Sequence, residues 1–341
     1  NNKIVKLKLF IMTAAICTLA ACQSKSVSEE SDWSKMELNG KVKSLTETMY
    51  EAIEGVHGIE TGMIQTDPFF SYILFNKSGM IVENDYFDTN YGVRIRIVSK
   101  YDKYGNRIEE TSYDSDDNLN ERSVFKYDRN GNMIEGVSYD ADGAEAYRLT
   151  SLYDDDNNIV ETSVSSYLDG GMQRKAFYKY DAKGNKIEEK MFGNGDVLMA
   201  SSMFKYDVDD NLVETTMDIP AQGSGGRAIY KYDGQKNKIE EAAYDLEGNL
   251  SARGFYKYDD EGREIEIFSY TGDSSMMNQV LYEYNNLGKI AKQRQFRTMY
   301  GTTQEYVYEY TEFDKHDNWT KQIIYIDSEP STVSLREIEY F

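Results

Sequence analysis

Proline, histidine and cysteine are scarce in this chain of 341 residues, which contains 3 Pro, 2 His and 2 Cys. Proline has no backbone N–H to donate, so its scarcity fits a chain made mainly of hydrogen-bonded strands. Two histidines leave little room for histidine-based acid–base or metal chemistry. Both cysteines, Cys17 and Cys22, stand near the N-terminus, which excludes disulfides and thiolate metal clusters from the rest of the chain.

Basic residues are also few relative to acidic ones, with 38 Lys and Arg against 59 Asp and Glu and a formal charge of −21. A surface of this sign repels phosphate backbones, so we expect no nucleic-acid partner. The abundant residues are 29 Tyr and 25 Gly, which are typical of β-strands joined by tight turns. We expect no cofactor and no resident metal.

The N-terminus has the layout of a signal peptide. Residues 3–8 (KIVKLK) are basic, and the apolar run 9–21 (LFIMTAAICTLAA) is too short for an ordinary membrane-spanning helix. The run ends in LAAC, residues 19–22, which resembles the lipobox of bacterial lipoproteins. That resemblance implies removal of residues 1–21 and lipidation of Cys22 in the outer membrane, on either the periplasmic face or the cell surface. The polar residues 22–34 then form a flexible tether.

An aromatic residue recurs with a period of 26 residues. Phe75 extends the series backward by one period, and Phe313 extends it forward after a three-residue insertion, which gives ten units within residues 75–341. Residues 35–74 lack the period, and we expect them to form strands that cap the first edge of the sheet. The tyrosines of the series, spaced by 26 except for one interval of 27, are Tyr101, Tyr127, Tyr153, Tyr180, Tyr206, Tyr232, Tyr258 and Tyr284.

Each unit contains a turn motif. If the first Tyr is position 0, Asp is frequent at position 1, Gly at position 4 and Asn at position 5. An Asp that opens a type I turn accepts hydrogen bonds from the amides ahead of it, and Gly takes the left-handed conformation that closes a hairpin with a bulge. Each unit is therefore predicted to contain two strands and two turns. The clearest turn residues are Asp102, Gly105, Asn106, Asp128, Gly131, Asn132, Asp181, Gly184 and Asn185.

This turn also predicts which residues share a face of the sheet. Tyr101 is expected opposite Arg107, and Lys100 opposite Ile108. Alternation along the strands then places the Tyr of position 0, the Glu of position 8 and the aromatic residue of position 24 on one face. The β-branched residue of position 7 and the Lys of position 25 fall on the other face. Neither face is purely polar, which argues against a flat sheet with one wet side.

Ten units of two strands make a very large sheet. A twist of about 20° per strand would accumulate to about 400° over about twenty strands, and open sheets of this size curl, flatten or split. We therefore predict an all-β fold for residues 75–341, a long antiparallel β-meander of about ten 26-residue two-strand repeats in a coiled or spiral, solenoid-like sheet. A stack of short two-stranded solenoid rungs is the alternative.

The motif Tyr-Asp-x-x-Gly-Asn resembles the YD repeats of the RHS family, and the resemblance covers roughly residues 75–320. The chain as a whole looks like a short YD-repeat lipoprotein of the Bacteroides group. Large RHS proteins wind their repeats into a shell around a C-terminal toxin, which implies a β architecture for this chain as well. This chain is far shorter and shows no autoprotease segment or toxin domain, so encapsulation does not follow from the resemblance.

Three features could carry chemistry, and each also has a structural interpretation. Asp-rich turns such as residues 154–158 (DDDNN) loosely mimic calcium loops but lack a twelfth-position Glu and flanking helices. The regular Glu series at position 8 lacks the single distinctive carboxylate pair of a glycosidase. The aromatic series reads mainly as cross-strand packing. Its alternative role is to stack on ligand rings, for which the candidates are Phe204, Tyr230, Tyr256, Tyr282 and Tyr308.

These observations favour a non-enzymatic, lipid-anchored repeat protein of the envelope that serves as a binding or scaffold surface for protein or glycan. An accessory or immunity-like relative of RHS toxin systems is the alternative, and a glycan-active enzyme is a third hypothesis. We expect function where a unit departs from the pattern, at residues 219–226 and 299–312.

Overall fold

The computed structural model describes residues 31–341 except 57, 65–69, 89–92, 168–170 and 298–300. The predicted signal peptide, Cys22 and the first part of the predicted tether lie outside the described residues. The last part of that tether contains the short helix α2 (Asp32–Lys35), and two 3-10 turns, η1 (Asn194–Asp196) and η2 (Pro220–Gln222), follow later. Within the described residues no helix has the length and apolar character needed to cross a membrane.

Almost everything else is β-strand. The 23 strands in the described part of the chain are β1 (Val42–Gly55), β2 (Gly58–Ile64), β3 (Phe70–Phe75), β4 (Ile81–Asp88), β5 (Val93–Tyr101), β6 (Arg107–Tyr113), β7 (Leu119–Tyr127), β8 (Met133–Asp140), β9 (Glu145–Tyr153), β10 (Ile159–Ser166), β11 (Met172–Tyr180), β12 (Lys186–Gly193), β13 (Val197–Tyr206), β14 (Leu212–Ile219), β15 (Ser224–Tyr232), β16 (Lys238–Tyr244), β17 (Leu250–Tyr258), β18 (Glu264–Thr271), β19 (Met276–Tyr284), β20 (Ile290–Arg297), β21 (Thr302–Phe313), β22 (Trp319–Ile326) and β23 (Glu329–Tyr340).

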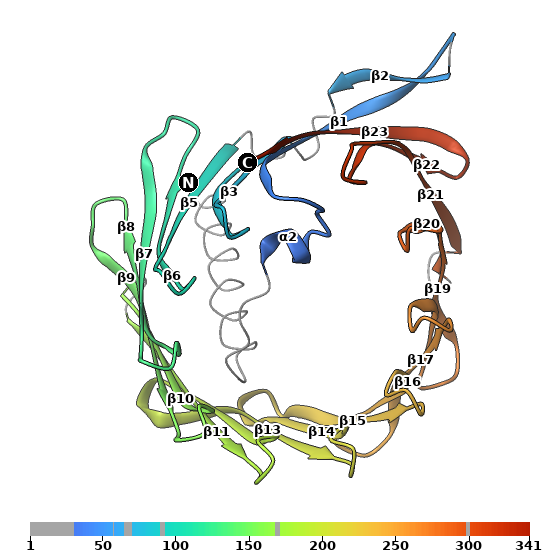
Figure 1. Cartoon of the computed structure of the whole chain (residues 1–341). Coiled ribbons are helices and arrows are strands. Elements are labelled where there is room, and N and C mark those ends of the chain that lie inside the picture. The colour runs from blue at the N-terminus through green and yellow to red at the C-terminus, as the bar shows by residue number, and fades with distance from the viewer. Residues whose placement is uncertain (1–30, 57, 65–69, 89–92, 168–170, 298–300) are drawn as a thin grey trace. The chain divides into compact units, whose positions relative to one another are not determined.

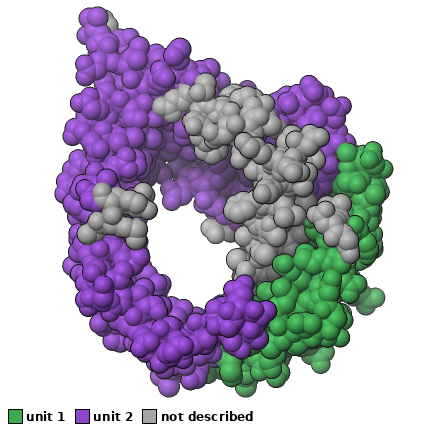
Figure 2. All heavy atoms as spheres, turned by 180° about the vertical axis from the view of Figure 1, so that it is seen from behind, with its two compact units in different colours: residues 1–29, 101–109, 122–203 green, residues 30–100, 110–121, 204–341 purple. Residues whose placement is uncertain are grey.

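The chain divides into two compact units, drawn in green and purple in Figure 2. In the described part, the first unit comprises residues 101–109 and 122–203, and the second comprises residues 31–100, 110–121 and 204–341. Within each unit, strands that follow one another in the sequence pair antiparallel, as β10 does with β9 and β11, and β17 with β16 and β18. This is the meander that the repeat predicts.

The predicted open, coiled sheet is wrong, and so is the stack of rungs, because the sheet closes on itself within the second unit. Strand β1 pairs with the last strand, β23, along one edge, where Val42 lies opposite Tyr340. Along its other edge β1 pairs with β3, where Ser44 lies opposite Leu74 (Figure 1). Strand β2 pairs with the distal part of β1. The result is a closed antiparallel β-barrel of 22 strands among the described residues, with β2 as an additional strand.

Closure has a clear physical reason. An open sheet leaves rows of unpaired N–H and C=O groups on both end strands, and a strand bonded on both edges removes them. Burial is deepest where β1 and β23 meet, because Val42, Val333 and Ser334 are each 0% exposed. Residues 35–74 therefore do more than cap one edge.

The register differs from the predicted one by a bulge in several hairpins that the Tyr-Asp turn closes, such as β11–β12, β15–β16 and β17–β18. Lys179 lies opposite Glu188 and Tyr180 opposite Lys186, so Ile187 is the extra residue of the bulge. The same shift occurs at Lys231 and Glu240 and recurs in the next unit. The predicted pairing of position 25 with position 7 is therefore wrong in these units. The Glu of position 8 lies opposite the Lys of position 25 and shares its face, whereas the Tyr of position 0 lies on the other face.

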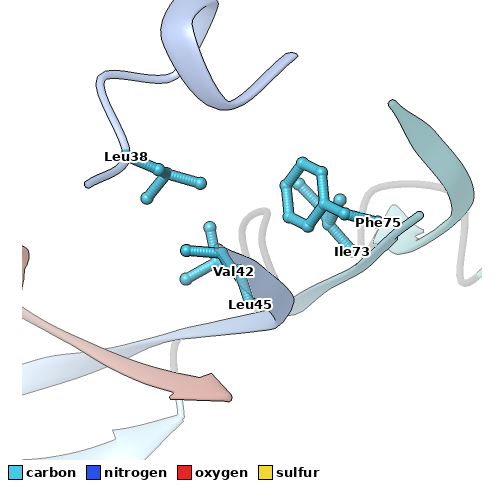
Figure 3. Close-up of a cluster of buried hydrophobic side chains, with 5 residues drawn as sticks. All are labelled: Leu38, Val42, Leu45, Ile73 and Phe75. Carbon is cyan, nitrogen blue, oxygen red and sulfur yellow. The ribbon is translucent and has the colours of Figure 1, made fainter. Parts of the chain in front are cut away.

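We call these two surfaces the lysine–glutamate face, with positions 8 and 25, and the tyrosine face, with positions 0, 6 and 24. Near closure, the tyrosine face is covered by residues 31–38. Leu38, Val42, Leu45, Ile73 and Phe75 form the buried cluster drawn in Figure 3, and Trp33 packs against it. The Trp33 Nε1–H donates to the Val42 carbonyl oxygen at 2.9 Å. The aromatic side chain of Phe75 is thereby 98% buried, since its exposed fraction is 2%.

Candidate functional site

The predicted turn residues form a hydrogen-bonded loop in each unit. Asp102 Oδ1 accepts from the backbone N–H of Tyr104 at 2.8 Å and from that of Asn106 at 3.0 Å, and the Asn106 side chain donates to Oδ2. Gly105 is in the left-handed region with φ 93°. Asp128 and Asp181 accept the same bonds from Asn132 and Asn185, and Gly131 and Gly184 also have positive φ. These residues therefore have turn-forming roles that use their polar atoms.

The turn hydrogen bonds make stability depend on pH. At Asp102, partial burial acts to raise the carboxyl pKa, but hydrogen bonds from Asn106 and the turn amides outweigh it and lower the pKa. Asp128 and Asp181 also have lowered pKa values. A group whose folded-state pKa lies below its unfolded value, about 3.9, stabilises the fold above that value and stops doing so as the pH falls through the folded pKa.

We therefore expect the urea midpoint of unfolding to be nearly constant above about pH 5 and to fall steadily between about pH 5 and pH 2. Urea titrations monitored by tryptophan fluorescence at several pH values measure it. The variant Asp128→Asn keeps an acceptor oxygen without the charge, so its midpoint should fall less over the same range. Equal midpoints at pH 6 and pH 2.5 would contradict this account.

The glutamates of position 8 are occupied by cations on the lysine–glutamate face. Glu188 pairs with Lys179 at 3.1 Å, and Glu240 pairs with both Lys231 at 3.0 Å and Arg253 at 2.6 Å. A hydrogen bond from Lys257 lowers the pKa of Glu266. Hydrogen bonds from Lys190 and Lys179 lower the pKa of Glu188. A glycosidase general acid needs a raised pKa. This series is therefore a row of surface ion pairs.

The tyrosines of position 0 join neighbouring repeats through hydrogen bonds from their hydroxyl groups. In each case the phenol donates to the backbone carbonyl at position 6 of the preceding unit, and burial raises the pKa of Tyr180 to about 12. This use of the hydroxyl distinguishes position 0 from position 24. The bonds are Tyr127 to Arg107, Tyr153 to Met133, Tyr180 to Ile159, Tyr232 to Leu212, Tyr258 to Lys238 and Tyr284 to Glu264, at 2.7–2.9 Å. Tyr310, three residues before Phe313, donates in the same way to the Ile290 carbonyl oxygen at 3.5 Å.

The five predicted stacking aromatics of position 24 all belong to the second unit and are half-buried: Phe204, Tyr230, Tyr256, Tyr282 and Tyr308. Desolvation raises the pKa of Tyr256, Tyr282 and Tyr308. Two of the five, Tyr230 and Tyr256, are brought to the same lysine. Lys238 Nζ lies 4.5 Å from the Tyr256 ring centroid and 5.7 Å from the Tyr230 ring centroid.

The lysine beside these rings belongs to an ion pair with Glu241. Lys238 Nζ donates to Glu241 Oε2 at 2.6 Å. Directly opposite Glu241 in the neighbouring strand is Gly254, where an added Cβ would lie 3.4 Å from Glu241 Cγ and 3.5 Å from the Tyr256 hydroxyl. The absence of a side chain at Gly254 makes room for these polar groups. Tyr230, Lys238, Glu241 and Tyr256 together form what we call the tyrosine–lysine cluster.

A glutamate without a counter-charge lies two strands further along. Glu264 is opposite Tyr258 in the sheet, and its backbone oxygen accepts from the Tyr284 hydroxyl at 2.7 Å. Its carboxylate has no hydrogen bond or ion pair with any described residue. Burial raises the pKa of Glu264, which the charge of Lys238 only partly offsets.

The two expected pattern breaks have different structures. Residues 219–226 contain η2 and then Gly225 and Gly226, where an added Cβ would lie 2.3 Å and 2.2 Å from backbone carbonyl oxygens of neighbouring strands. This break is a close backbone approach. The described part of residues 299–312 contributes to a pocket of about 280 Å³, lined by Gln295, Thr302, Thr303, Gln304 and Asp327. Its described lining is polar and lacks an aromatic side chain.

Sequence reasoning missed Lys238, Glu241, Gly254 and Glu264. A signal for two of them was present, because the turn places position 6 opposite position 0, and Lys238 and Glu264 are both at position 6. Glu241 and Gly254 depend on the bulged register. Among the described residues, no three His, Cys, Asp or Glu side chains are arranged to hold a metal ion.

No family model matches this chain, and no curated protein matches it. Among solved structures, the RHS/YD-repeat toxin complex TcdB2-TccC3 aligns with 77% of this chain at 11% identity and a TM-score of 0.33. That alignment spans 20% of the toxin chain, so this chain corresponds to about a fifth of its length. A porin-like protein from Bacteroides uniformis ATCC 8492 aligns over 88% of this chain and 99% of its own, at 9% identity and a TM-score of 0.32. Both are similar β-rich structures, and similarity at this level identifies no function.

Proposed function

We propose that this chain is a lipid-anchored envelope protein without catalytic activity, and that the tyrosine face of strands β15–β19 binds a glycan. The observation that supports the proposal most directly is the tyrosine–lysine cluster. Its half-buried rings of Tyr230 and Tyr256 flank Lys238 at 5.7 and 4.5 Å, with Glu241 bonded to that lysine. Sugars present apolar C–H faces and polar hydroxyl edges, and a ring beside a bonded donor and acceptor matches both.

Charge on both faces of the sheet favours an aqueous binding surface over a lipid-facing wall. The lysine–glutamate face carries pairs such as Lys205 with Glu214 at 2.7 Å, and the tyrosine face carries Lys238 with Glu241. A charged residue on a lipid-facing strand costs up to about 2–4 kcal/mol at the bilayer midplane. Ion pairs that recur on one face and also occur on the other are therefore consistent with water on both sides of these strands.

The lipid anchor rests on the LAAC sequence at residues 19–22. Diacylation at Cys22 would hold the protein at the outer membrane, on either the periplasmic face or the cell surface. Labelling of cells with a radioactive fatty acid tests the anchor, since Cys22→Ala should lose the label and leave the membrane fraction.

The binding proposal predicts that Tyr256→Ala weakens glycan binding by at least about tenfold, or 1.4 kcal/mol. A glycan array identifies a ligand of the purified protein, and calorimetry compares the variants. Tyr104→Ala is the matched control, because Tyr104 is 78% exposed in the turn from Asp102 to Asn106 and is not a member of the cluster. Binding that is unchanged in Tyr256→Ala contradicts the proposal. New reducing ends on incubation, abolished by one Glu→Gln substitution, would contradict the absence of catalysis.

A further inference from the structure

Position 6 carries a charge in three of the four units that begin at Tyr180, Tyr206, Tyr232 and Tyr258, and two of these charges are neutralised within their own strand. Lys186 bonds Glu189 at 2.7 Å, and Lys238 bonds Glu241 at 2.6 Å, so position 6 pairs with position 9. In the unit that begins at Tyr258 the sign at position 6 is reversed, because the residue is Glu264. Position 9 of that unit is Ile267, which offers no counter-charge.

The surroundings of Glu264 are aromatic and apolar. Tyr258 lies directly opposite it, and the hydroxyl of Tyr284 bonds its backbone oxygen at 2.7 Å. Tyr282 precedes Tyr284 by two residues and therefore lies on the same face. Ile267 is opposite Tyr256, the ring of the tyrosine–lysine cluster. The Glu264 carboxylate thus adjoins the proposed glycan surface.

Burial and the charge of Glu264 act in the same direction on the neighbouring phenols. The charge of Glu264 contributes to the raised pKa values of Tyr258, Tyr282 and Tyr284, after the larger effect of burial in each case. Lys238, whose positive charge partly offsets the raised pKa of Glu264, is already bonded to Glu241. Lys238, Glu241 and Glu264 together leave one net negative charge, held among aromatic rings where desolvation makes it costly without a partner.

We propose that Glu264, together with the rings of Tyr256 and Tyr282, forms a subsite for a protonated amine on the bound glycan, so that the ligand is an amino sugar with a free ammonium group. This inference rests on the proposed function, because it assigns the chemistry of one end of the same surface. A carboxylate supplies the charge-assisted hydrogen bond that an ammonium group prefers. Aromatic faces attract the same cation through their quadrupole.

The test compares two ligands that differ only at the nitrogen. An oligomer of β-1,4-linked glucosamine and its N-acetylated counterpart are titrated calorimetrically into the full chain at pH 6. We expect the glucosamine oligomer to bind at least about tenfold more tightly than the N-acetylated one. Glu264→Gln removes the charge at nearly constant shape, so it should abolish this preference while leaving binding of the N-acetylated oligomer unchanged.

Controls separate the subsite from general attraction to an acidic protein. Glu247→Gln removes an equal charge from an exposed turn and should keep the preference. A preference that survives in Glu264→Gln, or that Glu247→Gln reduces as strongly, overturns the inference. Displacement of the glucosamine oligomer by an equal concentration of trilysine would assign the subsite to any primary amine and overturn its assignment to a sugar.

The outcomes also distinguish this inference from the proposed function. If both oligomers bind equally and Tyr256→Ala weakens both, the glycan surface stands and the amine subsite fails. If neither oligomer binds and no other glycan does, the proposed function fails and the subsite fails with it.

Discussion

Replacing Val333 by Asp should lower the free energy of unfolding by about 3–5 kcal/mol, because it places an unpaired charge at a fully buried position. Val333 is 0% exposed and lies between Tyr50 of β1 and Ile323 of β22. The substitution therefore attacks the contact through which β1 closes the sheet. Urea unfolding at neutral pH measures the loss as a shift of the midpoint.

The control for this variant is Val208→Asp. Val208 is 89% exposed in the turn after β13, so the same change of residue should alter stability by less than about 0.5 kcal/mol there. Hydrogen exchange adds a local readout. In Val333→Asp, the amides of β1 and β23 should exchange faster relative to those of β16 and β17, because closure is lost before the hairpins melt. Similar midpoints for the two variants would show that closure contributes little.

The closure of the sheet could not be predicted from the repeat. Hairpin turns are local, and their residues carry a signal within five positions, as from Asp102 to Asn106. The pairing of Val42 with Tyr340 joins residues almost 300 positions apart, and β1 lies in the part of the chain that lacks the period. A twisted sheet of this size satisfies its end strands either by capping or by joining them. No sequence pattern indicates whether the end strands are capped or joined.

The predicted assignment of position 8 to the tyrosine face is wrong because of one extra residue in the hairpin. A type I turn with a left-handed Gly predicts a hairpin with a bulge, whereas the predicted pairing of Lys100 with Ile108 contains no extra residue. The extra residue, Ile187 in one unit, moves Glu188 from the tyrosine face to a position opposite Lys179. One residue of register reverses the face of each side chain beyond it. The glutamates of position 8, which the predicted pairing places on the tyrosine face, are bonded to lysines on the other face.

The candidate site shows the same division between local and non-local information. The period alone predicts all five aromatic candidates of position 24. The partners that distinguish Tyr256 from Phe204 come from other strands and from the bulged register, as with Glu241 opposite Gly254. Glu264 is conspicuous only once position 6 is known to pair with position 9, since Ile267 then leaves it without a counter-charge.

The last prediction uses two phenylalanines that the period treats as equivalent. Phe75 and Phe313 both stand where a tyrosine begins other units. Neither has a hydroxyl group that could donate a hydrogen bond to the preceding repeat. Phe75 is 2% exposed and packs against Trp33, with ring centroids 6.2 Å apart. Phe313 is 39% exposed. Phe75→Ala should therefore cost about 3–5 kcal/mol through lost burial and the cavity left behind, and Phe313→Ala about 1 kcal/mol or less.

Chemical denaturation of both variants measures the two free energies, and Trp33 fluorescence reports on the Phe75 site directly. A blue-shifted emission in the wild type that moves toward that of exposed tryptophan in Phe75→Ala would show that residues 31–38 detach from the tyrosine face. Equal losses in the two variants would mean that the N-terminal segment does not stabilise this end of the sheet. The burial of Phe75 depends on residues outside the repeat, so the difference between the variants measures how strongly that segment holds the closed sheet together.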